Sequence, residues 1–246
     1  MRNVKAIFKK QFKGTIQNPE TMIQFAIFPA LAWLMGFLVV TDFYGIPYDI
    51  AAMMAANMPN MVTMQATIFA GMALIPVVTS VIAGDVERKS IRFLTMAGVS
   101  PMSYLIGVGG VILLAGFASS VAFSFIGGFE GRDFWIFTAA MMSGVAASTV
   151  LGAIFGVMTS NQQSASALSM PAAIVLGFGP MMAQMNENIA RYLHPIYTQQ
   201  LNVVAEYLER GYSGTPLWQA FAIMWANVAV ICLLFALVYH KKGLTG

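Results

Sequence analysis

The charged residues of this sequence are confined to short segments, and their placement limits the possible folds more than any other feature. Five stretches contain no Asp, Glu, Lys or Arg: residues 21–41, 50–84, 93–129, 134–186 and 211–240. Each is long enough for a helix to cross a bilayer core of about 30 Å, which takes about 20 residues. Only 9% of all residues are charged, whereas a soluble domain carries about a quarter. The sequence therefore predicts a membrane protein.

The fourth stretch is too long for one crossing, because it contains 53 residues and is divided by a polar run at 159–164. Six transmembrane helices are therefore predicted, at residues 21–40, 60–83, 104–127, 134–158, 165–185 and 217–239. Helices are expected because backbone groups in lipid must be satisfied internally, and these runs lack the alternation of barrel strands. The predicted fold is a single all-α polytopic membrane domain over residues 1–246.

The positions of Lys and Arg predict the orientation, because these residues collect on the cytoplasmic side of membranes. Ten of the thirteen lie in residues 2–13, 88–92 and 241–242, which an even number of spans places on one side. Both termini of a multi-pass protein of the cell membrane are thus predicted to be cytoplasmic. Residues 1–18 predict an amphipathic interfacial helix in the inner leaflet. The alternative, a signal peptide, is disfavoured because the following apolar run is long and ends without a small-x-small cleavage site.

The sequence lacks the residues that catalysis or metal binding would need. No ionisable residue lies near the middle of a predicted span, which disfavours a proton-coupled carrier. One cysteine, Cys232, and two histidines, His194 and His240, provide neither a disulfide nor a zinc site. No Gly-Lys dipeptide occurs, so there is no phosphate-binding P-loop. We expect no enzyme, no bound cofactor or metal and no nucleic-acid partner; ATP hydrolysis, if used, belongs to a separate polypeptide.

Methionines gather at the outer ends of the second, fourth and fifth predicted spans, and uncharged polar residues occur within the spans. The 19 methionines have three interpretations: adaptable core filling, a soft vestibule for apolar cargo, or thioether ligands for Cu(I), which the absence of nearby Cys and His disfavours. The polar side chains either form hydrogen bonds between helices or line a substrate path. The candidate substrate-path residues are Met64, Gln65, Met142, Met181, Met185 and Asn227.

Small residues and prolines predict how the spans pack. Ala140, Gly144, Ser148, Gly152 and Gly156 recur every four residues, which indicates a stripe suited to close helix approach. Prolines within the second and fifth predicted spans permit kinks, because proline removes a helix hydrogen bond. The stripe is expected to pack helices within the chain, with a dimer contact as the alternative.

The segment between the second and third predicted spans carries the strongest functional pattern. Its charges are followed at once by Phe93 and Leu94 and then by a Val-Ser-Pro turn. On a helix Ser90, Phe93 and Leu94 share one side, which predicts a short amphipathic helix at residues 85–98. The plainer interpretation is a solvated loop whose basic residues set the topology.

This segment resembles the inner loop of type-2 ABC exporter permeases. The matching residues are Asp85, Glu87, Arg88, Ser90, Ile91, Leu94, Val99, Ser100 and Pro101, and the order of the remaining segments is similar over almost the whole chain. The resemblance implies a six-helix permease that pairs with a second copy or a related permease and binds two copies of a cytoplasmic ABC ATPase. That ATPase would hold ATP and Mg. The resemblance also implies short re-entrant helices in the outer segment, residues 186–215.

In such permeases the inner loop acts as a coupling helix that docks on the ATPase. The resemblance therefore implies Phe93 and Leu94 in an apolar ATPase pocket, with rim ion pairs from Asp85, Glu87, Arg88 and Arg92. Lys89 stands where many members of the family have glycine, which predicts a more regularly helical backbone at this position.

The leading hypothesis is the membrane subunit of an ATP-driven exporter for a hydrophobic or amphipathic compound, such as a drug, a peptide or a lipid-like molecule. A secondary carrier or channel without an ATPase is one alternative. A structural or sensory membrane subunit is the other. Copurification of an ATPase separates the first hypothesis from the carrier or channel.

Overall fold

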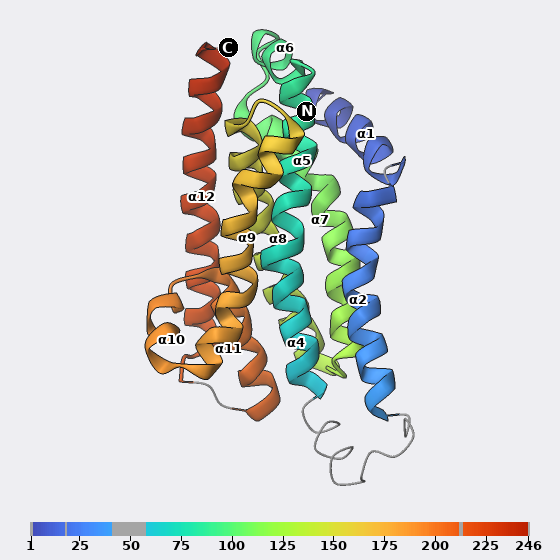
Figure 1. The fold of residues 1–246 in the computed structure, drawn as a ribbon, viewed down its shortest axis with the longest axis vertical. Coiled ribbons are helices and arrows are strands. Elements are labelled where there is room, and N and C mark those ends of the chain that lie inside the picture. Colours follow the sequence, from blue (N-terminus) through green and yellow to red (C-terminus); the bar gives the residue numbers. More distant parts are fainter. Residues whose placement is uncertain (1, 18, 41–57, 212–213, 246) are drawn as a thin grey trace.

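The computed structural model describes residues 2–17, 19–40, 58–211 and 214–245, and within these ranges every regular element is a helix (Figure 1). The prediction of an all-α fold is confirmed for this part of the chain. The elements are α1 (Arg2–Gln17), α2 (Pro19–Val40), α4 (Met58–Ile68), the π-helix η1 (Phe69–Ala73), α5 (Leu74–Glu87), α6 (Ser90–Met96), α7 (Pro101–Ile126), α8 (Gly131–Met158), α9 (Gln162–Met185), α10 (Glu187–Leu193), α11 (Tyr197–Arg210) and α12 (Leu217–Thr245).

Five helical segments are long and apolar enough to cross a membrane. They are Met61–Glu87, Pro101–Ile126, Gly131–Met158, Gln162–Met185 and Leu217–His240, and they coincide with the second to sixth predicted spans. The first predicted span falls on α2, in which Thr21–Met35 forms a shorter apolar helix. The described chain is therefore an all-α protein with several membrane-suited helices, while the count of six spans stays a prediction.

The long helices run side by side, and the short ones gather at the two ends of the bundle (Figure 1). One end, which we call the α6 end, carries α1, α6 and the last turns of α12. The opposite end, the α11 end, carries α10 and α11, which occupy the segment 186–215 where short outer helices were expected. The segments that were predicted to share the cytoplasm thus lie at one end.

Small residues bring α8 against α5. A Cβ atom added at Gly152 would lie 2.8 Å from the Ile75 carbonyl oxygen, and one at Gly156 would lie 2.7 Å from Ile82 Cβ. The Thr79 hydroxyl donates a hydrogen bond to the Gly152 carbonyl at 3.1 Å. The predicted small-residue stripe is therefore a packing surface within the chain, as close helix approach in membranes requires.

The membrane-suited segment Met61–Glu87 contains one wide turn. In η1 the Leu74 N–H donates to the Phe69 carbonyl five residues earlier. Pro76 follows three residues after η1. Because proline has no N–H, it cannot donate a hydrogen bond to the carbonyl of residue 72. The π turn and the proline thus interrupt the α-helical hydrogen bonding at the same place. The wide turn meets α9 at two glycines: a Cβ at Gly71 would lie 2.6 Å from the backbone of Leu176, and one at Gly177 would lie 2.7 Å from Met72 Cβ.

Candidate functional site

The segment predicted as one coupling helix over residues 85–98 is divided in two. Asp85 and Glu87 belong to the end of α5, and α6 begins only at Ser90. Between them Lys89 adopts a left-handed backbone with φ of 56°, and its N–H donates to the Val86 carbonyl at 2.8 Å. The prediction of a regularly helical backbone at Lys89 is therefore wrong. A left-handed residue after a helix end is the usual way to stop a helix and redirect the chain.

The C-terminal end of α6 is also fixed by local geometry. Gly98 has a positive φ of 74°, a conformation that glycine adopts without a steric cost. Ser100 then caps α7: its hydroxyl accepts a hydrogen bond from the Ser103 N–H at 3.2 Å, and Pro101 occupies the first helical position. The Val-Ser-Pro turn noted in the sequence thus starts α7.

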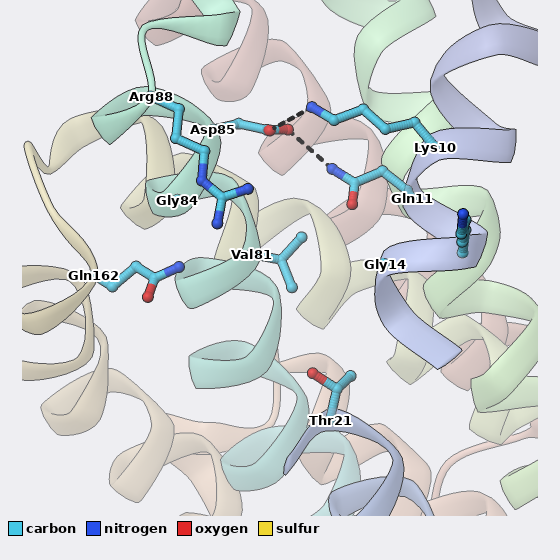
Figure 2. A pocket seen from close by; sticks show the side chains of 10 residues that line it. Lys10, Gln11, Gly14, Thr21, Val81, Gly84, Asp85, Arg88 and Gln162 are labelled. Atoms are coloured by element: carbon cyan, nitrogen blue, oxygen red, sulfur yellow. Dashed lines mark hydrogen bonds and ion pairs between the residues drawn. The ribbon is translucent and has the colours of Figure 1, made fainter. Parts of the chain in front are cut away.

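Asp85 is buried at the end of α5, where it joins three helices. Lys10 of α1 lies 3.0 Å from Oδ1, Gln11 of α1 donates to Oδ2 at 2.9 Å, and the Tyr104 hydroxyl of α7 donates to Oδ2 at 3.0 Å. Figure 2 shows Lys10 and Gln11 reaching Asp85 from α1. The exposed rim position predicted for Asp85 is therefore wrong. We call these four residues the Asp85 cluster, and its role is to fasten α1 to α5 and α7.

The side chains of α6 divide into an anchor and an exposed face. Ile91 is buried in the bundle core, whereas Phe93 is 65% exposed and Met96 is 66% exposed. Leu94 packs against the core and, together with Ser90, Phe93 and residues of the Asp85 cluster, lines a groove between α6 and α1. The exposed apolar pair is thus Phe93 with Met96, rather than Phe93 with Leu94. Sequence reasoning noted Met96 after Phe93 and Leu94 but did not assign it to the docking pair, although its spacing of three residues from Phe93 could have indicated this.

The charged residues around α6 lie in different surroundings. Glu87 is exposed, and its carboxylate accepts a hydrogen bond from the Gln162 N–H at the start of α9, at 3.4 Å. Arg88 is exposed and lines a cavity between α5 and α1 (Figure 2). The side chain of Arg92 lies outside the described residues. Contact between Glu87 and α9 also brings the uncharged segment 160–164 to the α6 end.

The six candidate substrate-path residues are absent from the described lining of the polar cavity between α4, α9, α10 and α11, which the next paragraph describes. Met64 and Gln65 lie on α4 and Met142 on α8, and all three are half-buried; Met181 and Met185 lie on an exposed face of α9, where Met185 is 80% exposed. Asn227 of α12 donates hydrogen bonds to the Pro195 and Ile223 carbonyls, both at 2.8 Å. For Asn227 the packing interpretation therefore describes the contacts best, while a substrate path through the methionines stays a prediction.

A polar cavity of about 520 Å³, the outer cavity, lies at the α11 end between α4, α9, α10 and α11. Its described lining includes Thr63, Gln184, Asn202, Glu206 and Glu209. Sequence reasoning noted Thr63 as a polar residue of a predicted span but did not single out the other four. The Thr63 hydroxyl donates to Glu209 at 3.2 Å. Partial burial raises the pKa of Glu209 above its ordinary value, against the opposing effects of this hydrogen bond and of a neighbouring arginine.

No group of three or more His, Cys, Asp or Glu residues that could hold a metal ion occurs in the described part of the chain.

A scan of the sequence against protein-family models finds no match, and a search of the curated proteins finds none either. The helical fold and its long apolar helices thus define the class of protein: an all-α protein whose apolar helices suggest a membrane location. The resemblance to type-2 ABC exporter permeases rests on the inner-loop residues and on the similar order of the segments along the chain.

Proposed function

We propose that this chain is the membrane-spanning permease subunit of an ATP-driven ABC exporter. In this proposal α2 and the five longer segments make six spans in the cell membrane, and the α6 end faces the cytoplasm. The chain pairs with a second permease and receives its energy from two copies of a separate ATPase that binds ATP and Mg. Its cargo is a hydrophobic or amphipathic compound, which moves outward.

The exposed apolar face of α6 is the observation that carries the proposal. Phe93 and Met96 project from a helix whose Ile91 is anchored in the bundle, and exposed charges of Glu87, Arg88 and Lys89 precede them. An apolar centre with a charged rim is the usual composition of a protein docking surface. This face lies at the end where basic residues collect, which the positive-inside rule assigns to the cytoplasm.

The attachment of α6 suits the transmission of motion. α6 is bounded by the left-handed residues Lys89 and Gly98, so it is a separate short rod rather than an extension of α5. The Asp85 cluster lies directly before it and holds α1 and α7 to the end of α5. A displacement imposed on α6 would therefore reach three helices as a rigid-body movement.

The outer cavity bears on the type of cargo. Glu206, Glu209 and the amides of Gln184 and Asn202 line it, and polar groups of this kind lose hydrogen bonds to water when a pure hydrocarbon covers them. They suit a cargo with amide, hydroxyl or amine groups. Within the proposed function, the cavity therefore favours an amphipathic cargo, such as a peptide or a drug with a polar group, over a wholly apolar lipid chain.

The proposal is tested by purifying the tagged chain from its membrane, identifying the copurifying subunits and measuring cargo-stimulated ATP hydrolysis after reconstitution. The informative variant is the double substitution Phe93→Ala and Met96→Ala. Burying one such side chain stabilises a contact by about 2 kcal/mol, so the double variant should weaken docking by about 4 kcal/mol, or about a thousandfold. Stimulated hydrolysis should be lost while membrane insertion is kept.

The matched control is the double substitution Phe12→Ala and Met102→Ala. These side chains are also exposed at the α6 end, but they lie on α1 and α7. They should leave stimulation nearly unchanged. The absence of any copurifying ATPase, or solute movement by the purified chain alone, would contradict the proposal and favour a carrier or channel. An equal loss of stimulation in both double variants would contradict the assignment of α6 as the docking helix.

A further inference from the structure

A cavity of about 370 Å³ at the α6 end is distinct from the exposed face of α6. It lies between α1 and α5, at the point where α2 and α9 begin, and we call it the basic cavity (Figure 2). Lys10 and Lys13 of α1 line it on one side, and Arg88, at the end of α5, lines it on another. Gln162, the first residue of α9, and the apolar Val81 also line the cavity.

The cavity holds an excess of positive charge. The acidic residue in its described lining, Asp85, is already engaged by Lys10 at 3.0 Å and by Gln11 at 2.9 Å. Among the described residues, neither Lys13 nor Arg88 has a carboxylate within ion-pair distance. Two cationic side chains therefore line the cavity with no negative partner among the described residues, and a bound anion would supply one.

The start of α9 adds polar donors to the same space. The Gln162 backbone N–H already donates to the Glu87 carboxylate at 3.4 Å, so Gln162 offers its side-chain amide to the cavity. The Gln162 side chain extends over Gly84 of α5, where an added Cβ atom would lie only 2.5 Å from its Nε2 atom. Gly84 thus leaves the room that the Gln162 amide occupies beside Arg88 (Figure 2). The combination of cationic side chains and an amide donor is suited to a phosphate group.

The position of the cavity along the bundle indicates the source of that phosphate. Val81 lies one helical turn before Asp85, within the apolar part of α5, and Thr21 lies at the start of the apolar part of α2. The lining therefore changes from apolar to basic across the cavity, at the edge of the membrane-suited helices. Lipid headgroups occupy this depth, with acyl chains on the apolar side and phosphates on the polar side.

We propose that the basic cavity binds the phosphate of an anionic lipid headgroup from the leaflet at the α6 end. Lys13 and Arg88 pair with the phosphate, the Gln162 amide donates to its oxygens or to the glycerol, and the acyl chains lie along α2 and α5. The bound lipid joins α1, α5 and α9, and it adds to the fastening that the Asp85 cluster provides. This assignment does not depend on the ATPase or on the direction of transport.

The test uses the purified full chain in a neutral detergent at low salt, with dioctanoyl phosphatidylglycerol, dioctanoyl phosphatidylcholine and inorganic phosphate as probes. Phosphatidylglycerol should bind at one saturable site. The double substitution Lys13→Gln and Arg88→Gln should weaken it about thirtyfold, since each cation near a lipid phosphate contributes about a fivefold gain in affinity. The matched control, Lys9→Gln with Lys89→Gln, removes the same charge from exposed neighbours outside the described lining, and it should change the affinity less than threefold.

Three results would overturn the proposal. Equal weakening in the two double variants would indicate diffuse attraction to a basic surface. Inorganic phosphate binding as tightly as phosphatidylglycerol would assign the cavity to a soluble phosphate compound. Equal affinity for phosphatidylcholine would remove the role of negative charge. The melting temperature of each variant verifies its fold, and the single variants, each expected to weaken binding about fivefold, replace the double variant if it does not purify in folded form.

Discussion

Replacing Asp85 with asparagine tests whether the Asp85 cluster fastens α1 to the bundle. The asparagine oxygen can still accept hydrogen bonds from Gln11 and Tyr104, but its NH2 group then faces Lys10, which is also a donor. Two hydrogen bonds to a charged acceptor become neutral ones, each about 1 kcal/mol weaker. The Lys10 ion pair, whose lysine side chain is 58% exposed, contributes about another 1 kcal/mol. The expected loss is about 3 kcal/mol.

Hydrogen–deuterium exchange measured by mass spectrometry is the appropriate assay, because it reports the opening of separate helices. A loss of about 3 kcal/mol corresponds to about a hundredfold faster exchange of the α1 amides. Peptides from the middle of α8 serve as the internal reference, since this helix makes no contact with the cluster in the described hydrogen bonds.

The matched control is Asp133→Asn, the same chemical change at an exposed residue in the first turn of α8. Its effect should be about 0.5 kcal/mol, through the helix dipole alone. If α1 exchanges no faster in the Asp85 variant than in the Asp133 variant, the buried carboxylate does not hold α1 and the reasoning fails. Unfolding of the whole chain would instead show exchange accelerated equally in α1 and α8.

Three further outcomes are expected. Gly71→Ala should lower the apparent stability in detergent by about 1–3 kcal/mol, because its Cβ would lie 2.6 Å from the α9 backbone, whereas Gly144→Ala, with its nearest contact at 3.5 Å, should be neutral or stabilising; equal effects in a denaturant titration would contradict the packing. Lys89→Gly should stabilise the chain by about 1 kcal/mol, because φ at Lys89 is 56°, and an unchanged melting temperature would count against a left-handed Lys89. The raised pKa of Glu209 means that the folded state holds this proton more tightly than the unfolded state. Stability from Glu209 is thus present below pH 4.5 and is lost as the pH rises through the folded pKa. Melting temperature is measured against pH for Glu209→Gln and for the exposed control Glu187→Gln. Above pH 4.5 it should fall less steeply in the Glu209 variant, and identical curves for the two variants would refute the shift.

The long helices could be predicted because a membrane imposes one simple requirement on sequence. A span needs about 20 residues without charge, so charged residues and polar runs limit where a helix can begin and end. The fourth predicted span and α8 both end at Met158, and the sixth predicted span and α12 both begin at Leu217. The orientation of each helix about its axis could not be predicted in this way. In lipid the outside of a bundle is as apolar as its core, so the hydropathy of methionine does not separate Met141, which is fully buried, from Met185, which is 80% exposed.

The α6 end was harder to predict because its contacts join distant parts of the chain. Lys10 and Asp85 are 75 residues apart, and helical spacing indicates which face a residue occupies but not which helix it meets. The density of charge from Asp85 to Arg92 therefore suggested solvent exposure for Asp85, whereas α1 covers it. Similarly, lysine favours continued helix by intrinsic propensity, yet Lys89 ends the helix. The turn lets α6 fold back so that Ile91 enters the core, and tertiary burial outweighs a local backbone cost of about 1 kcal/mol.

The two faces of α5 differ in a way that limits which helix could move if α6 is driven by a partner. On one face, Gly152 and Gly156 hold α8 within contact of the α5 backbone along two successive turns, and the Thr79 hydroxyl bonds across the interface. Interlocked surfaces of this type move together rather than slide. On the other face, α9 meets the wide turn η1 through Gly71 and Gly177. The first residue of α9 is bonded to Glu87, and α9 also packs against the short helix α10. A π turn can absorb a change in helix register. Movement from the α6 end should therefore displace α5 and α8 as one unit against α9, and the crossing of the two glycines is the point about which they would turn.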